Sequence, residues 1–371
     1  MRSSYPAESK TWVEISSANA GKNLAFFRKL VGPKVKIFSV VKSNAYGHGL
    51  VEFSGIMEKK GIDGFCVDSV SEGLELRESG IVSPILVLGY SSSSEMAIAS
   101  EADITVTVSN KDALADISLL KEKPDFHLKI DTGMRRQGFY PDEIAAVAKT
   151  CSKAGLANHL KGIYTHFAAA KDLCYPTFTE IQFDRFMKAC EILKRAGFSN
   201  ILRHASATGG TLLEKKYRLD AVRIGIGLYG LSPSKELELT VKDFHLKPVL
   251  SFKSVIAEIK KVKKGDYAGY DLSERLSRDS FLAVIPVGYW HGIPRALSSI
   301  GKIFVGGEPA RIIGRVSMDM IVVDVTGLKA KRGDIVEIVK DDSVYDMAAS
   351  MNASYYELLT RINPIIERRI V

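Results

Sequence analysis

Basic and imidazole side chains stand at the ends of several apolar runs in this 371-residue chain. Lysine and arginine are costly at the end of a buried segment unless they are paired or functional. A single one would most simply be an ion-paired residue, but several at equivalent positions favour a functional site. The residues in question are Lys42, Lys129, Arg136, His166, His204 and Arg223.

Lys42 has the most specific chemistry of the set. It directly follows Val40 and Val41 and is followed by a segment rich in small and polar residues. A lysine that leaves a buried strand is expected to lose part of its hydration, which favours a nucleophilic amine. Such an amine is what a Schiff base to an aldehyde cofactor requires, so Lys42 is a candidate attachment point.

The elements that carry these residues alternate between strands and helices. Nearly continuous apolar runs are typical of parallel strands buried on both faces, and helical patterns such as 178–196 separate them. Eight such units in about 200 residues predict an α/β fold with a (β/α)8 TIM-type barrel, whose chemistry lies at the carboxyl ends of the strands. The predicted strands are 35–42, 63–68, 84–90, 103–108, 126–131, 160–166, 201–204 and 221–224.

The pattern changes after the barrel. Strand-like runs follow one another without long helices between them, which predicts a mostly antiparallel β domain with a short helix near 354–362. We therefore expect the barrel over residues 1–245 and the β domain over 246–371, with residues 1–15 as a segment that could pack on the second domain. The predicted strands of the β domain are 249–259, 281–287, 303–305, 310–313, 320–325 and 335–339.

Composition excludes several classes of protein. With 46% hydrophobic and 25% charged residues, the chain is neither disordered nor a disulfide scaffold. Its net charge of +8 is scattered, so no nucleic-acid partner is expected. No run approaches the roughly 20 apolar residues of a membrane span, and the N-terminus lacks an apolar signal core. The four cysteines show no zinc spacing, and we expect a cytoplasmic protein without a metal site.

Residues 40–49, with the sequence VVKSNAYGHG, resemble the pyridoxal-phosphate attachment motif of the alanine racemases. The resemblance extends from residues 11–15 (TWVEI) to residues 356–361 (YELLTR), which is nearly the whole chain. It implies a barrel followed by a β domain, and pyridoxal 5'-phosphate bound to Lys42. It also implies a homodimer with an active site shared across the interface, and interconversion of L- and D-alanine.

Further barrel motifs match in the family's order. Residues 129–138 (KIDTGMRRQG) resemble a motif in which Arg136 approaches the phenolic oxygen of the cofactor and the substrate carboxylate. A guanidinium offers a planar fork of donors that matches a carboxylate. Lys129 matches a lysine that is carbamylated in some members and would hold Arg136, although an ordinary buried ion pair is the alternative. His166 matches the motif of the sixth strand.

The resemblance also assigns the phosphate and the ring nitrogen of the cofactor. Thr208, at an expected helix start, and the backbone of Gly225 and Ile226 would bind phosphate, as barrels often do after their last two strands. Residues 225–230 spell GxGxxG, but a dinucleotide site needs a helix next, and here the β domain follows. Tyr46 and Tyr356 match side-chain donors to the phosphate.

Arg223 would face the pyridine nitrogen and, because arginine keeps its proton, would leave that nitrogen unprotonated. An unprotonated ring is a weaker electron sink, which disfavours side reactions. Racemisation needs one base on each face of the substrate's Cα. Lys42 would serve one face, and a tyrosine of the partner subunit's β domain the other. Tyr270 fits the family's spacing better than Tyr267, and a hydrogen-bond chain through His166 to Arg223 would assist it.

Two segments of the β domain resemble substrate-side motifs. Tyr289, Met318 and Asp319 are retained, but Ser317 stands where cysteine is common. Trp290 and the following histidine replace a usual Ala-Asp pair. These departures bear on substrate range more than on the reaction.

Three alternatives stay open at this point. The chain could racemise another small amino acid such as serine, because a hydrophobic pocket discriminates weakly against one added hydroxyl. It could be a decarboxylase of the same fold, although Arg223 disfavours this because such enzymes are expected to place an acid there. It could also be a non-enzymatic cofactor-binding barrel, but those proteins lack a second domain.

Overall fold

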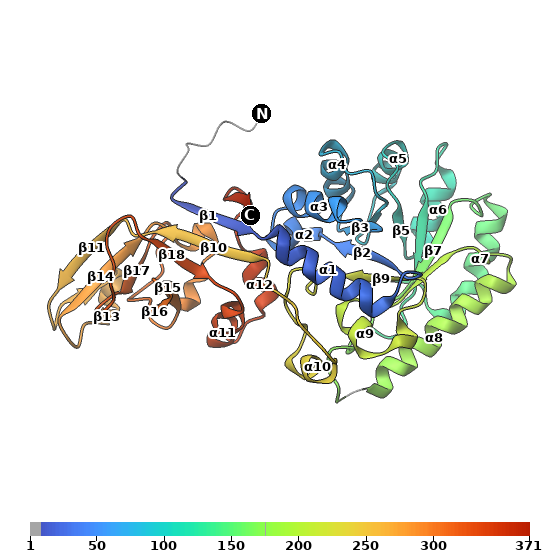
Figure 1. The fold of residues 1–371 in the computed structure, drawn as a ribbon. Helices are drawn as coiled ribbons and strands as arrows, with labels where there is room; N and C mark the ends of the chain where they lie inside the picture. The colour runs from blue at the N-terminus through green and yellow to red at the C-terminus, as the bar shows by residue number, and fades with distance from the viewer. Residues whose placement is uncertain (1–8, 175) are drawn as a thin grey trace. The chain divides into compact units, whose positions relative to one another are not determined.

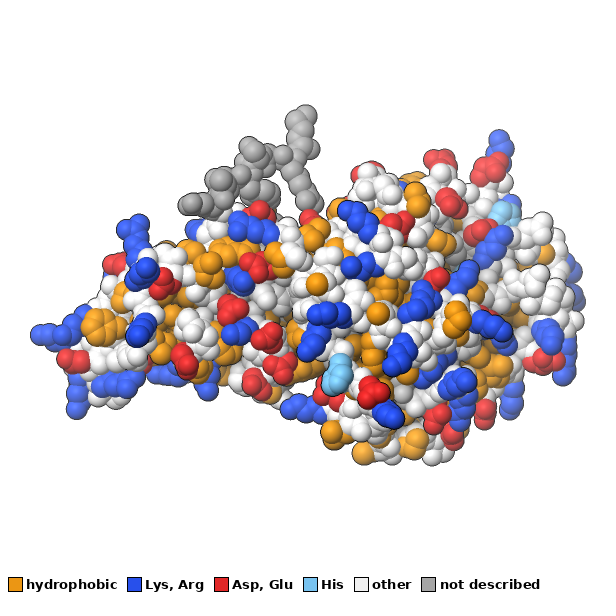
Figure 2. All heavy atoms as spheres, viewed as in Figure 1, with side chains coloured by type: hydrophobic (Ala, Val, Ile, Leu, Met, Phe, Trp, Pro, Cys, Tyr) orange, Lys and Arg blue, Asp and Glu red, His pale blue; other side chains and the backbone are white. Residues whose placement is uncertain are grey.

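The computed structural model describes residues 9–174 and 176–371 of the chain. They form two compact units. The barrel unit comprises Ala20–Ala45 and Phe53–Lys247. The β unit comprises the described part of Met1–Asn19 together with Tyr46–Glu52 and Pro248–Val371. On each unit, the face seen in Figure 2 mixes acidic and basic side chains.

The barrel unit holds eight parallel strands with helices around them (Figure 1). Backbone hydrogen bonds pair these strands into two four-stranded sheets, ordered β4-β3-β2-β9 and β5-β6-β7-β8. Parallel bridges between Leu86 and Thr105 and between Ala207 and Arg223 join the two sheets into a nearly closed ring. The strands are β2 (Lys36–Val40), β3 (Gly64–Val67), β4 (Ile85–Val87), β5 (Val106–Val108), β6 (Phe126–Lys129), β7 (Leu160–Tyr164), β8 (Leu202–His204) and β9 (Ala221–Ile224).

All eight predicted barrel strands are therefore confirmed, each somewhat shorter than predicted except β9. Continuous burial explains why they were recognisable, since every residue of β3, β4, β5, β6 and β9 is buried. The α-helices that begin in or cover this unit are α1 (Ser17–Val31), α2 (Lys42–Tyr46), α3 (Leu50–Lys59), α4 (Val70–Glu78), α5 (Ser93–Glu101), α6 (Lys111–Leu119), α7 (Ile144–Lys153), α8 (Pro176–Arg195), α9 (Thr208–Leu213) and α10 (Lys235–Thr240).

The β unit is built from three sheets. The largest has the order β16-β15-β18-β10-β1-β19, in which β1 pairs antiparallel with β10 and parallel with β19. A three-stranded sheet has the order β11-β14-β17, and β12 and β13 form a small hairpin. The strands are β1 (Thr11–Ile15), β10 (Leu250–Val255), β11 (Glu258–Val262), β12 (Tyr267–Ala268), β13 (Glu274–Arg275), β14 (Ser280–Ile285), β15 (Lys302–Val305), β16 (Glu308–Arg311), β17 (Ile321–Asp324), β18 (Ile335–Val339) and β19 (Glu367–Ile370); the helices are α11 (Ser343–Ser350) and α12 (Tyr355–Thr360).

The prediction of one strand over residues 249–259 is wrong. The chain changes sheets at Ile256 and Ala257, between β10 and β11. The Ile256 N–H donates to the Asp334 carbonyl, and the Ala257 N–H donates to the Val284 carbonyl in β14. Two neighbouring residues thus pair with different sheets, which local sequence cannot reveal.

No helix within residues 9–174 and 176–371 is long and apolar enough to cross a membrane.

Candidate active site

Lys42 lies at the carboxyl end of β2, as predicted for the chemistry-bearing end of a barrel strand. Its Nζ is 2.9 Å from Oδ1 of Asp68, which follows β3. The side chain is 36% exposed, so it has lost part of its hydration, as expected, and it is still accessible. What the barrel provides is an accessible primary amine beside a carboxylate.

The turn after Lys42 has an unusual backbone. Ser43, Asn44 and Ala45 have φ values of 56°, 54° and 50°, a left-handed turn made without glycine. Such a turn costs roughly 1–2 kcal/mol per residue, and strain of this kind persists only where the surroundings hold it. Glu72 of α4 does so, because its carboxylate accepts the N–H of Ser43 at 2.6 Å and the N–H of Asp68 at 2.7 Å. One carboxylate thereby fixes the backbone on both sides of the Lys42–Asp68 pair.

Arg223 is only 2% exposed, yet its hydrogen bonds go to neutral acceptors. NH1 donates to Nδ1 of His204 at 2.6 Å, and NH2 donates to the carbonyl of Thr165 at 2.7 Å. Among the described residues no carboxylate lies within ion-pair distance of Arg223, and its Nε makes no hydrogen bond. The arrangement holds a buried cation in place and leaves one donor available.

A buried pair of histidines continues from Arg223. Nε2 of His204 is 2.8 Å from Nδ1 of His127, and the His204 ring stacks on Tyr164 with centroids 4.9 Å apart. Burial and the nearby Arg223 charge lower the pKa of His127 to about 3, and they also lower the pKa of His204. Both rings are therefore neutral. Because Arg223 donates to Nδ1 of His204, the His204 proton lies on Nε2 and donates to His127.

His127 was missed by the sequence reasoning. It lies within the apolar run of β6, where a histidine looks like a core residue. The signal that the sequence offered was a histidine two residues before Lys129 in the same predicted strand.

Lys129 is buried at the end of β6, and its Nζ donates to Oε1 of Gln137 at 2.9 Å. Burial, together with the charges of Arg136 and Arg223, lowers the pKa of Lys129 to about 8. No carboxylate in the described chain pairs with it, so the alternative of an ordinary buried ion pair is not supported.

The loop that carries Arg136 is organised by Asp131. The Asp131 carboxylate accepts the N–H groups of Gly133, Arg135 and Arg136 at 2.9, 3.1 and 3.2 Å. With its carboxylate occupied by backbone donors, Asp131 leaves the exposed Arg136 guanidinium to face anions.

The pKa of His166 reflects its burial and the positive charge at this end of the barrel. Burial and the charges of Arg223, Arg136, Lys129 and Lys42 lower the pKa of His166 to about 3. A neutral imidazole thus lies among four cationic side chains. A phosphate and a substrate carboxylate are the kind of groups that such a field attracts.

Thr208 begins α9, and its Oγ1 accepts the N–H of Gly227 at 3.4 Å. A Cβ on Gly227 would lie 2.5 Å from the Phe27 ring of α1 and 2.8 Å from Cγ2 of Thr208 in α9, so only glycine allows the 225–230 loop to approach these helices this closely. First-turn N–H groups have no partner within their own helix, and such groups suit an anion. Loop, rather than helix, follows β9 as far as α10, which agrees with the rejection of a dinucleotide site.

The β unit gathers a second set of predicted residues around a cavity of about 640 Å³. Tyr270, Tyr289, Ser317 and Met318 all line it. Three arginines that sequence reasoning did not assign also line it, although the last of them ends the quoted motif 356–361: Arg295, Arg315 and Arg361. The cavity therefore combines phenols with cations, a composition suited to anionic substrates.

Tyr270 and Tyr267 differ in their surroundings. The Arg275 guanidinium lies over the Tyr267 ring, 5.8 Å from the ring centroid. Tyr270 instead lines the cavity and is 68% exposed. The geometry favours Tyr270 over Tyr267.

Tyr46 and Tyr356 lie close together within the β unit, with ring centroids 5.9 Å apart. Burial raises the pKa of Tyr356, so its hydroxyl stays a neutral donor. Asp319 follows Met318 and acts on His291: burial lowers the pKa of His291, and the Asp319 charge opposes this. The part of the chain that the structure describes holds no cluster of three or more His, Cys, Asp or Glu side chains suited to a metal ion.

Comparisons with known proteins agree with this geometry. The family model for the alanine racemase N-terminal domain matches residues 15–233, and that for the alanine racemase C-terminal domain matches residues 249–370. An alanine racemase of Leptospira interrogans is 35% identical over 97% of this chain and 96% of its own length. One from Desulforamulus reducens is 38% identical over 90% of this chain and 88% of its own.

Solved structures give the same result. A Bacillus anthracis alanine racemase with bound L-Ala-P superposes with a TM-score of 0.92 at 31% identity, covering 99% of this chain and 96% of that one. An enzyme from Streptomyces lavendulae gives a TM-score of 0.89 at 29% identity, with 99% and 98% covered. Both family models, near-complete coverage and the two sets of site residues lead to one conclusion: the chain belongs to the alanine racemase family.

Proposed function

We propose that this protein is a pyridoxal-phosphate-dependent isomerase that interconverts L- and D-alanine by a two-base mechanism. The observation that carries the proposal is that one barrel holds both an accessible Lys42 amine and a buried Arg223, which has no carboxylate partner among the described residues. The alanine racemases to which the chain is similar match it over 96% and 88% of their own length. When bound, the cofactor supplies an electron-withdrawing group that acidifies the Cα proton of the substrate.

The residues present fit that cofactor. Lys42 would offer the amine for its covalent attachment, and Thr208 with the backbone of Gly225 and Ile226 would offer the phosphate site. Tyr46 and Tyr356 would add hydroxyl donors to that phosphate. The cationic field that keeps His166 neutral favours the negative charge of the group.

Arg223 would direct the reaction toward proton transfer. Four neutral acceptors hold the guanidinium in place, and because arginine keeps its proton, Arg223 would donate to the ring nitrogen without protonating it. Excess charge at Cα is then short-lived, which disfavours decarboxylation and transamination. Arg136 would bind the substrate carboxylate, in a loop whose backbone N–H groups the Asp131 carboxylate holds.

A low pKa gives Lys129 a reactive amine that could carry a carbamate. A carbamate would add a negative charge beside Arg136.

Two bases would act on opposite faces of Cα. Lys42 would hold or move the proton on the D-alanine side, and the partner subunit's Tyr270 the proton on the L-alanine side. Arg295, Arg315 and Arg361 line the same cavity as Tyr270 and give it a cationic lining. The protein would therefore act as a homodimer, with Tyr289 and Met318 limiting the space beside the substrate methyl group.

A chiral assay tests the activity. Purified protein with added cofactor should convert L-alanine to D-alanine well ahead of L-serine to D-serine. Serine turned over faster would leave the bases in place but overturn the interpretation of Met318 and Ser317. Bound cofactor with no D-product, or with release of carbon dioxide, would overturn the racemase proposal.

A further inference from the structure

The loop that carries Tyr270 has little support of its own. It connects β12 to β13, which pair only through Tyr267 with Arg275 and Ala268 with Glu274. Asp271 and Leu272 within it have φ values of 58° and 50°. Two more backbone hydrogen bonds, from Gly265 to Leu276 and from Leu276 to Asp266, extend the hairpin at the end opposite the loop. A hairpin this short is marginal alone, so the loop with Tyr270 depends on further contacts.

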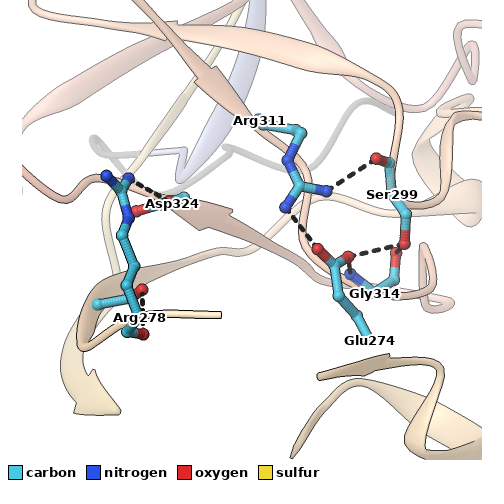
Figure 3. Close-up of polar contacts among 7 residues, drawn as sticks. Glu274, Arg278, Ser299, Arg311, Gly314 and Asp324 are labelled. Carbon is cyan, nitrogen blue, oxygen red and sulfur yellow. Dashed lines mark hydrogen bonds and ion pairs between the residues drawn. The ribbon is translucent and has the colours of Figure 1, made fainter. Parts of the chain in front are cut away.

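Glu274 makes those contacts from the second arm of the hairpin (Figure 3). Its Oε1 accepts from NH2 of Arg311 at 2.5 Å. Its Oε2 accepts from the Ser299 hydroxyl at 2.8 Å and from the Gly314 N–H at 2.7 Å. Burial would raise the pKa of Glu274, but these hydrogen bonds outweigh it and lower the pKa, so the carboxylate is charged at neutral pH.

The first arm of the hairpin and the loop contact the segment that contains Gly314 and Arg315. A Cβ on Gly269 would lie 3.0 Å from the Arg315 nitrogen, and Asp271 lies 3.0 Å from Nε of Arg315. Residues 314 and 315 lead directly into Ser317 and Met318, which line the cavity with Tyr270. Glu274 thus connects the loop that carries Tyr270 to a second segment that lines the same cavity.

We propose that Glu274 is a positioning residue for Tyr270, holding the phenol at its place in the cavity through the Ser299, Arg311 and Gly314 contacts. This inference rests on the proposed function, because it matters for catalysis only if Tyr270 is a base. Glu274 itself would not touch the substrate.

The test is deuterium uptake at Cα, measured for each alanine enantiomer in deuterated water. The equilibrium concentrations of L- and D-alanine are equal, so the loss of either base lowers kcat/KM for racemisation equally in both directions. Racemisation rates therefore cannot show which base was lost. Uptake without inversion is different, because Lys42 alone can exchange the proton of D-alanine. We expect Glu274→Ala to lower racemisation and uptake into L-alanine by about tenfold to a hundredfold, and uptake into D-alanine by less than about threefold.

The chain offers a matched control in Arg278→Ala. Arg278 pairs with Asp324 at 3.1 Å in the same unit, apart from the Glu274 cluster (Figure 3). This variant should leave both uptake rates within about twofold of wild type. Glu274→Gln, which keeps the shape and one acceptor oxygen, should recover part of the L-alanine uptake.

The outcomes separate the two levels of the hypothesis. Equal losses for both enantiomers in Glu274→Ala, or the same asymmetry in Arg278→Ala, would overturn the positioning role. Tyr270→Phe in the same assay tests the proposed base. If Tyr270→Phe is asymmetric and Glu274→Ala is not, only the role of Glu274 fails; if Tyr270→Phe is symmetric, the assignment of Tyr270 as the base fails.

Discussion

The barrel unit and the β unit present their functional residues in opposite ways. In the barrel, Arg223, His204 and His127 are buried and linked by hydrogen bonds into one fixed arrangement. In the β unit, Tyr270 and Met318 are largely exposed on a cavity that is open to solvent. A buried cation network suits a site that binds a cofactor, whereas exposed aromatic and methionine side chains are typical of a surface that meets another molecule.

The difference follows from architecture. The carboxyl ends of eight parallel strands converge, so side chains far apart in sequence meet at one rim. The β unit instead places its reactive residues in hairpins and loops, which need anchors such as Glu274. We infer that the barrel builds the cofactor half of the site, and that the β unit supplies the second base.

The largest effect is expected at the barrel half. Lys42→Ala removes both the attachment amine and one base, so racemisation should fall by about 10⁴-fold or more, and the visible absorbance of bound cofactor should change. The control is Lys36→Ala, an exposed lysine at the other end of the same strand. Unchanged absorbance in Lys42→Ala would contradict the assignment.

The β half should show a large but one-sided effect. Tyr270→Phe should slow racemisation by about 10²–10³-fold, yet leave deuterium uptake into D-alanine nearly intact, since only one face loses its base. Tyr267→Phe is the matched control and should stay within about twofold of wild type. If Tyr267→Phe is the more damaged variant, the choice between the two tyrosines is wrong.

A smaller effect is expected from a change in the hydrogen-bond network that holds Arg223. His127→Leu leaves the buried Nε2–H of His204 without an acceptor, which costs about 1–3 kcal/mol and loosens Arg223. We expect about a tenfold loss in kcat/KM and lower stability to urea, with partial recovery in His127→Asn, whose amide oxygen can accept. Wild-type kinetics in His127→Leu would show that Arg223 needs no support from this side.

The smallest effect is a pH dependence of stability from Lys129. Its pKa is about 8 in the folded protein against an ordinary 10.5, so the unfolded chain binds more protons between these values. Stability should therefore rise with pH in this window, by about 2 kcal/mol between pH 7.5 and 9.5 relative to Lys129→Met. Urea unfolding of both proteins measures it, and parallel pH curves would contradict it. Added bicarbonate should flatten the difference if the amine is carbamylated.

Sequence reasoning succeeded where structure follows from local pattern. Continuous apolar runs revealed the eight barrel strands, and the residues ending them included Lys42 and Arg223. It failed where long-range partners decide. The sheet change at Ile256 depends on Asp334 and Val284, and the role of Glu274 depends on partners 25 to 40 residues away. The Asp68 partner of Lys42 is likewise 26 residues away along the chain.

We infer that the two halves of one active site come from two subunits. Lys42→Ala and Tyr270→Phe chains, each with its own affinity tag, can be produced together and the mixed dimer isolated through both tags. If the halves are shared across the interface, the mixed dimer contains one intact site and should recover about half the wild-type racemase activity, although each parent dimer is nearly inactive. A mixed dimer as inactive as its parents would show that Lys42 and Tyr270 of the same subunit work together, and would contradict the account.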